Sequence, residues 1–243
     1  MNLDGRVALV TGSSSGIGEA TARSLAAAGA AVVVNSSTSA AAGKAVAQSL
    51  PRAVYVQASV ADAAACQALV DATLAEYGRL DILVNNAGTT QLIPHADLDA
   101  ATDEVWDKIL STNLMGTWHM TRASVPALKA SGAGSVVNVT SVAGLRPTGS
   151  SIPYAVSKAG INHLTRLLAS VLGPEIAVNA VAPGLVDTPW TADWAAARER
   201  VTAEAPMQRP ATPQDVAETI MGLIGARFVT GQVVAVDGGM SLR

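Results

Sequence analysis

Short apolar runs alternate with longer amphipathic stretches along the whole chain. The short runs are rich in Val and nearly continuous, which is typical of strands buried on both faces of a parallel sheet. The longer stretches are rich in Ala and repeat their apolar residues at helical spacing. The predicted strands are Val7–Val10, Val32–Val34, Ala53–Val56, Ile82–Val84, Ser135–Val139, Ala177–Val181 and Val233–Val236. The predicted helices are Glu19–Ala28, Ala40–Leu50, Ala63–Tyr77, Glu104–Leu128, Tyr154–Leu172 and Pro213–Ile224.

This alternation predicts a doubly wound α/β fold, in which helices cover both faces of a parallel sheet. No repeat, low-complexity tract or linker divides the chain, so we expect one domain over residues 1–243. The long irregular stretch Pro183–Thr212 contains two tryptophans and a polar helical patch. Because long loops in compact domains are often functional, residues 185–212 are predicted to form a substrate lid.

Composition narrows the possible functions. Of 243 residues, 49% are apolar and 14% are charged, which excludes a disordered chain. The net charge of −3, without a cationic stripe, argues against nucleic acid and membrane partners. The single cysteine, Cys66, excludes an internal disulfide and fits a cytoplasmic protein. No apolar run is long enough to span a bilayer, and no histidine has a companion at metal-ligand spacing, so we expect no metal.

A glycine cluster follows the first predicted strand and leads into a helix, as Thr11-Gly12-Ser13-Ser14-Ser15-Gly16-Ile17-Gly18. A phosphate at a helix N-terminus needs exposed backbone N–H groups and residues without Cβ, so this pattern predicts nucleotide binding. The alternative is a tight strand-to-helix turn without a ligand. The predicted contacts are Gly12, Ser14, Ser15, Gly16, Ile17 and Gly18.

The end of the second strand indicates the cofactor preference. An acidic residue usually binds the ribose 2′-hydroxyl of NAD at this position, but here the chain has Asn35-Ser36-Ser37-Thr38. Hydroxyls at Ser36 and Ser37 can bind a 2′-phosphate, so NADPH/NADP⁺ is favoured over NADH/NAD⁺. The alternative is a polar turn.

Tyr154 and Lys158 are four residues apart and therefore share a face of the predicted helix. A neighbouring ammonium favours the phenolate, so we expect Lys158 to lower the pKa of Tyr154. A tyrosine–lysine pair alone is more often an ordinary surface pair. Here Ser141 and the run Asn86-Ala87-Gly88 follow other predicted strands, at the sheet edge where ligands bind. Asn113 interrupts an apolar helix and needs a partner if buried.

Together these motifs resemble the short-chain dehydrogenase/reductase family. The resemblance covers the whole chain in order and implies a seven-stranded Rossmann-type sheet. It implies hydride transfer between a nicotinamide cofactor and a carbonyl or secondary alcohol. The residues that carry it are Thr11–Gly18, Asn85–Gly88, Asn113, Ser141, Tyr154, Lys158, Pro183, Gly184, Thr188, Thr230, Gly231 and Asp237–Gly239.

The resemblance assigns a role to each catalytic residue. Tyr154 would exchange the proton with the substrate oxygen, and Ser141 would hold that oxygen. Lys158 would bind the cofactor ribose, and Asn113 would fix a water in a proton relay. The other cofactor contacts implied are Asn86, Ala87, Gly88, Tyr154, Lys158, Pro183, Gly184, Val186 and Thr188.

Within the family, the two ends of the chain are most similar to bacterial 3-oxoacyl-(acyl carrier protein) reductases. An acidic carrier protein requires basic residues beside the entrance, yet residues 126–134 include only Lys129. Trp190 and Trp194 are four residues apart and are predicted to project from one helix face. With Leu92 and Leu145 they predict an apolar substrate pocket. Alternatively, the tryptophans dock the lid onto the body.

Other functions remain open on the same scaffold. They are a dehydrogenase of a polyol, sugar, steroid or other cyclic alcohol, and a noncatalytic dinucleotide-binding protein. A sugar-nucleotide epimerase or dehydratase normally has a longer chain. The region 104–128 is apolar around most of its circumference, which together with the resemblance predicts a homotetramer. The residues used for this prediction are Ile109, Leu110, Leu114, Met115, Trp118 and Met120.

Overall fold

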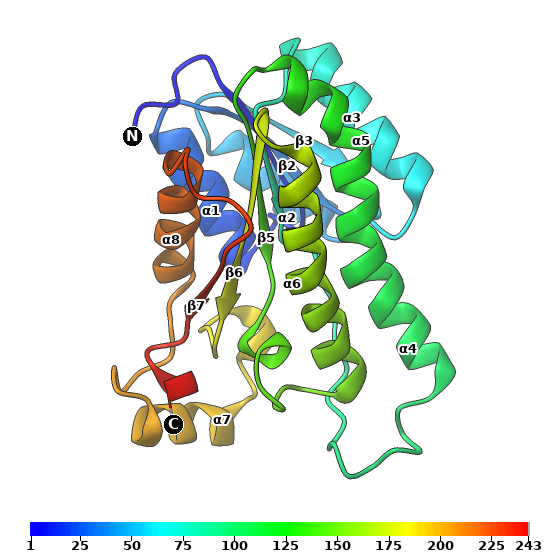
Figure 1. The fold of residues 1–243 in the computed structure, drawn as a ribbon, viewed down its shortest axis with the longest axis vertical. Helices are drawn as coiled ribbons and strands as arrows, with labels where there is room; N and C mark the ends of the chain where they lie inside the picture. The colour runs from blue at the N-terminus through cyan, green and yellow to red at the C-terminus, as the bar shows by residue number, and fades with distance from the viewer. Residues whose placement is uncertain (243) are drawn as a thin grey trace.

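A computed structural model describes residues 1–242 and has a seven-stranded parallel sheet at its centre (Figure 1). The strand order is β3-β2-β1-β4-β5-β6-β7, which confirms the doubly wound arrangement. Every predicted strand is present, and β2 and β6 extend beyond their predicted ends. The strands are β1 Val7–Val10, β2 Ala31–Ser36, β3 Ala53–Gln57, β4 Ile82–Asn85, β5 Gly134–Val139, β6 Ile176–Pro183 and β7 Val233–Val236.

Helices cover both faces of this sheet, as the apolar strands require. Helices α1, α2 and α8 pack on one face, and α3, α4, α5 and α6 pack on the other (Figure 1). Each layer has its own core of aliphatic side chains. The helices on the two faces are α1 Gly16–Ala27, α2 Ala40–Gln48, α3 Ala63–Tyr77, α4 Asp103–Leu110, α5 Gly116–Ala130, α6 Ile152–Leu172 and α8 Pro213–Gly225.

The predicted helix Glu104–Leu128 is present, but it is not a regular α-helix throughout. A π-helical turn, Ser111–Met115, separates α4 from α5 and contains the buried Asn113. Helix α5 then packs closely on the neighbouring structure, since a Cβ on Gly116 would lie 2.7 Å from Val60 Cγ2. The spacing of apolar residues does not reveal a change from i→i+4 to i→i+5 bonding, which is why this turn was not predicted.

Buried polar side chains link the central strands to the helices on one face. The amide of Asn85 donates to Asn138 Oδ1 (2.9 Å) and to Thr121 Oγ1 (3.0 Å). The amide of Asn138 in turn donates to Thr165 Oγ1 on α6 (2.9 Å). Thr121 and Thr117 donate along α5, and Thr117 reaches the carbonyl of Asn113 (2.8 Å). This chain of bonds satisfies the buried amide N–H groups and hydroxyls, which would otherwise be costly to bury, and leaves Oδ1 of Asn85 without a partner.

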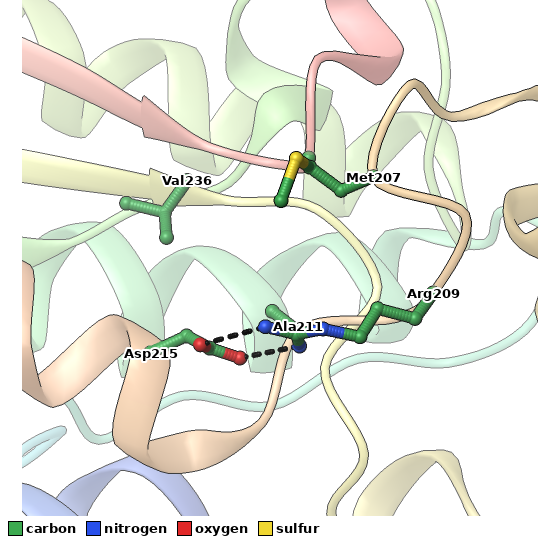
Figure 2. A pocket seen from close by; sticks show the side chains of 6 residues that line it. Met207, Arg209, Ala211, Asp215 and Val236 are labelled. Carbon is green, nitrogen blue, oxygen red and sulfur yellow. Dashed lines mark hydrogen bonds and ion pairs between the residues drawn. The ribbon is translucent and has the colours of Figure 1, made fainter.

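The segment 185–212 crosses the edge of the sheet at the carboxyl ends of the strands (Figure 1). It contains the short helix η3 Pro189–Thr191 and helix α7 Ala195–Glu204. Val186 pairs with Ala211 in a parallel bridge that joins the two ends of the segment. At the far end, the guanidinium of Arg209 binds both carboxylate oxygens of Asp215 on α8, as Figure 2 shows.

No helix in residues 1–242 combines the length and the apolar character needed to cross a bilayer. Within the same residues, no group of three or more His, Cys, Asp or Glu side chains is placed to hold a metal ion.

Candidate active site

The glycine loop lies where the strand order reverses, between β1 and β4. Gly12 and Gly16 have φ values of +60° and +57°, which side chains disfavour. Gly18 is required for a different reason, because a Cβ there would lie 2.4 Å from the carbonyl oxygen of Gly12. The loop therefore folds only with small residues and brings the N-terminus of α1 to the edge of the sheet.

Asn86 braces this loop. Its Nδ2 donates to the carbonyls of Thr11 (3.0 Å) and Gly12 (2.8 Å). The hydroxyl of Thr11 accepts from the backbone N–H groups of Asn86 and Ala87, both at 3.0 Å. The amide of Asn86 thus holds the glycine loop in shape, and Ala87 and Gly88 provide the cleft surface beside it.

A cleft of about 200 Å³ runs from the glycine loop past the end of β2. Ser36 is buried and its hydroxyl bonds Tyr55 Oη (2.9 Å), so it is already partnered, whereas Ser37 is exposed in the cleft. The sequence analysis placed Asn35 in the segment that ends the second strand but did not name it as a contact, and it missed Ala58, Ser59, Val60 and Thr112, which lie outside its motifs. The lining residues are Gly12, Ser14, Asn35, Ser36, Ser37, Thr38, Ser39, Ala58, Ser59, Val60, Ala87, Gly88 and Thr112.

Asn35 illustrates what a motif search overlooks. Its Nδ2 donates to the carbonyls of Val56 and Ala58, both at 3.1 Å, and thereby fixes the chain after β3. Its Oδ1 accepts from the backbone N–H of Gly12 at 3.4 Å. A polar residue at the end of an apolar strand was the available signal in the sequence.

Helix α6 presents Tyr154 and Lys158 at the adjoining end of the site. The helix begins at Ser151, whose hydroxyl accepts from the N–H of Tyr154 (3.4 Å). Lys158 is 4% exposed, and its Nζ lies 5.5 Å from the Tyr154 ring centroid. The ammonium donates to the carbonyl of Val139 (2.9 Å) at the end of β5. The four-residue spacing therefore places the pair together, as predicted.

The predicted lowering of the Tyr154 pKa was wrong for the chain alone. Burial raises the pKa of Tyr154 to about 12, and a hydrogen bond with the Ser141 side chain offsets part of that increase. Burial also lowers the pKa of Lys158 to about 8. Desolvation disfavours the charged form of each group and outweighs the mutual effect that their spacing suggested. The phenol is consequently protonated at neutral pH.

Ser141 and Asn113 complete the group of predicted catalytic residues. Ser141 Oγ accepts from the N–H of Ala143 (3.1 Å) and caps the turn that follows β5. The Asn113 amide donates to the carbonyl of Thr89 and the hydroxyl of Ser157, each at 3.0 Å. A Cβ on Gly88 would lie 3.4 Å from Asn113 Oδ1 and 3.7 Å from Lys158 Nζ. Gly88 thus lies beside both side chains.

The segment 185–212 supplies the remaining predicted residues. A Cβ on Gly16 would lie 3.2 Å from Thr188 Cγ2, so Thr188 faces the glycine loop. Pro183 ends β6 and Gly184 follows it. The side chain of Val186 is packed in the core and is closed to a ligand.

The prediction that Trp190 and Trp194 share one helix face was wrong. Trp190 lies in η3, and Trp194 is the residue before α7, because the chain turns between the two helices. Trp190 packs edge-to-face on the Tyr154 ring. Leu92 and Leu145 are 70% and 42% exposed.

The comparisons with known proteins agree with this geometry. A protein-family model described as enoyl-(acyl carrier protein) reductase matches residues 12–241. A solved structure from Burkholderia xenovorans, titled as a short-chain dehydrogenase/reductase, superposes with a TM-score of 0.91 at 39% identity and covers 98% of each chain. The chain belongs to the short-chain dehydrogenase/reductase family. It is an oxidoreductase.

Two relatives place it further within the short-chain dehydrogenases/reductases. One is named as ketoacyl reductase 2 of the granaticin polyketide synthase of Streptomyces violaceoruber. It is 56% identical over 239 residues, which cover 97% of this chain and 96% of that protein. The other is the 3-oxoacyl-[acyl-carrier-protein] reductase FabG of Thermotoga maritima, which is 39% identical over 99% of both chains.

As a short-chain dehydrogenase/reductase, the protein uses a nicotinamide dinucleotide. The residues present fit this group. The glycine loop leaves no room for a Cβ at Gly18, and the cleft beside it is lined by hydroxyls without a carboxylate. Small residues and free N–H groups at a helix N-terminus suit a pyrophosphate.

The glycine loop generates the first test. Gly18→Ala places a methyl group against the carbonyl of Gly12, so we expect dinucleotide affinity to fall by at least about tenfold, or about 1.4 kcal/mol. The measurement is fluorescence titration with the reduced cofactor. Gly222→Ala on α8 is the control, because nothing lies within 4 Å of a Cβ there. Equal affinities for both variants and the parent would contradict the cradle.

Proposed function

We propose that this protein is an NADPH-dependent reductase of 3-oxoacyl thioesters or related ketones, with Tyr154 as the proton donor. The observation that carries the proposal is a partly buried tyrosine whose hydroxyl lies beside the Ser141 side chain, with the ammonium of Lys158 5.5 Å from the centre of the tyrosine ring. An acid and a second hydroxyl side by side suit a carbonyl oxygen that gains negative charge during reduction.

Tyr154 supplies the proton in this mechanism. The phenol is protonated at neutral pH, and it donates its proton to the substrate oxygen as negative charge develops there. Ser141 holds that oxygen through a second hydrogen bond and orients the carbonyl. The nicotinamide dinucleotide supplies the hydride to the carbonyl carbon when it is bound.

Lys158 and Asn113 support the proton transfer. Below a pH of about 8, Lys158 carries a positive charge that stabilises the phenolate left after donation. The amide of Asn113 donates to the carbonyl of Thr89, in the chain after β4, and to the hydroxyl of Ser157. These two bonds hold in place the segments next to Lys158. We assign to Asn113 the holding of a water that returns a proton from solvent.

The preference for NADPH rests on the end of β2. The exposed hydroxyl of Ser37 is the group best placed for a 2′-phosphate, since the Ser36 hydroxyl is bonded to Tyr55. No carboxylate among the residues lining the cleft would repel that phosphate. We infer that Ser37, rather than Ser36, is the main contact.

The substrate class follows from the named relatives and from the apolar surface of the site. Both relatives described above are named for the reduction of a 3-oxoacyl or ketoacyl group. Leu145 and Trp190 are partly exposed on the segments that follow Ser141 and precede α7.

We propose that residues 185–212 form the substrate lid of a domain spanning 1–243. We also propose a cytoplasmic location.

The exposed apolar residues available for a homotetramer interface differ from those used to predict the tetramer from the sequence. Ile109 and Met120 are buried within the chain and contribute nothing to an outer surface. Met115 is 42% exposed and is joined by three exposed aliphatic residues on α6. We propose that this surface, formed by Met115 of the π turn and by α6, packs between subunits. The α6 residues are Val156, Leu167 and Val171.

The mechanism predicts that Tyr154→Phe lowers kcat by about 10²- to 10⁴-fold, because the general acid is lost. NADPH affinity changes little. The assay is NADPH oxidation with an acetoacetyl thioester, and Tyr77→Phe on α3 is the matched control. A Tyr154→Phe enzyme with near-parental kcat would defeat the mechanism. A parent enzyme that reduces a crotonyl thioester but no ketone would replace ketone reduction by enoyl reduction.

For the cofactor, we expect kcat/KM to be at least about tenfold higher with NADPH than with NADH. Ser37→Asp reverses this preference, because a carboxylate repels the 2′-phosphate and binds a 2′-hydroxyl. Ser49→Asp adds the same charge beside Arg23, away from the cleft, and leaves the ratio unchanged. A tenfold preference of the parent enzyme for NADH would overturn the assignment.

The tetramer predicts a mass near four times the chain mass of 24.5 kDa in light scattering. The double variant Leu167→Glu, Val171→Glu places charge on the proposed interface and yields a smaller species with unchanged circular dichroism. A parent protein that elutes as a monomer contradicts the proposal.

A further inference from the structure

Trp190 packs edge-to-face on the ring of Tyr154. The two rings are 6.4 Å apart between centroids, with their planes at 81°. Ser141 bonds the phenol from the end of β5, and Lys158 lies near the ring from the same helix. Trp190 comes from a third element, η3, and is 48% exposed. One part of its surface therefore touches the proton donor while another faces solvent.

The backbone of Trp190 is firmly held. Helix η3 begins with Pro189 and has reciprocal capping bonds between Thr188 and Thr191. The hydroxyl of Thr191 also donates to the carbonyl of Val186 (2.5 Å). Val186 is buried and pairs with Ala211. These bonds fix η3 to the body of the protein, next to the end of β6.

Helix α7, which follows, is attached differently. It has no buried residue over its ten-residue length. An ion pair between Arg198 and Asp187 (2.6 Å) holds its first turn. Beyond its end, Ala205 is buried and the N–H of Met207 donates to the carbonyl of Gly238 (3.1 Å). The lid therefore consists of a fixed part that carries Trp190 and a helix that is secured mainly at its ends.

Building on the proposed reductase function, we propose that Trp190 is a positioning and specificity-determining residue. Its ring holds the phenol of Tyr154 in the orientation needed for proton transfer. The same ring is a fixed wall that admits a ketone with a narrow substituent, such as a linear 3-oxoacyl chain, and excludes bulky ring ketones.

Two physical effects support this role. An edge-to-face contact restricts rotation of the phenol, and small errors in donor position are costly in rate. We infer that the indole contributes to the burial that raises the pKa of Tyr154. The titratable group facing the phenol is Lys158, whereas Ser141 and Trp190 do not titrate in this range. Lys158, with a pKa of about 8, is already neutral when Tyr154 ionises.

Kinetics of three variants test the proposal. Trp190→Ala is expected to lower kcat for an acetoacetyl thioester by about 10- to 100-fold, while the Kd for NADPH stays within twofold. Trp190→Phe restores most of the loss because it retains a ring. The kcat/KM ratio of a bicyclic ketone, decalone, to the thioester rises in Trp190→Ala. Phe228→Ala is the matched control, since it removes a fully exposed aromatic ring outside the site and the lid, and it behaves like the parent enzyme.

An alkaline titration tests the contact independently of catalysis. Tyrosinate absorbance is followed up to the pH at which circular dichroism reports unfolding, and Tyr154→Phe identifies the contribution of Tyr154. We expect Tyr154 to ionise before unfolding in Trp190→Ala and to remain protonated in the parent and in Phe228→Ala.

Superimposable titrations of the parent and Trp190→Ala, or equal kinetic losses in Trp190→Ala and Phe228→Ala, would overturn the positioning role. An unchanged ketone ratio would overturn the specificity role. If the parent enzyme reduced neither ketone, the reductase function and the specificity role would both fail. The titration would still decide whether Trp190 controls the phenol.

Discussion

A pair of buried amides holds the two halves of the site together. Asn85 and Asn138 lie opposite each other on β4 and β5 and share a hydrogen bond of 2.9 Å. The first leads directly into the cofactor cleft, and the second precedes Ser141 by three residues. Since leaving a buried amide unpaired costs about 1 to 3 kcal/mol, neither strand can shift against the other without penalty. Their bonds to Thr121 and Thr165 extend the same constraint to α5 and α6.

The constraint explains why polar chemistry and a largely aliphatic core coexist. The core layers consist mainly of Val, Leu, Ile and Ala, whose packing alone does not fix one relative position of the strands and helices. Hydrogen bonds between the buried amides and hydroxyls fix that position. Tyr154 and Lys158 then lie on a helix whose position is determined by both kinds of contact. Burial favours the uncharged form of each, and the fold tolerates that cost where the reaction needs a protonated phenol.

The sequence predicted most of the fold, because a parallel sheet leaves a strong signal of continuous apolar runs. It also indicated the glycine loop and the Tyr154–Lys158 pair, whose spacings reflect backbone geometry directly. The π turn at Ser111–Met115 was not predictable, since apolar spacing is nearly the same on either side of it. The relation of Trp190 to Trp194 depends on a turn between two short helices, and the pairing of Ser36 with Tyr55 depends on strand register. Strand register decided the last of these points, and local changes in chain direction or winding decided the other two.

Helix α7 has a consequence for how such an enzyme diversifies. A helix that buries none of its side chains can change in sequence or length without disturbing either core layer. The groups proposed to move the proton lie on α6 and after β5, in well-packed parts of the chain. Mutation can therefore explore new substrates through α7 while the chemistry is retained. A scaffold divided in this way separates the evolution of recognition from the evolution of catalysis.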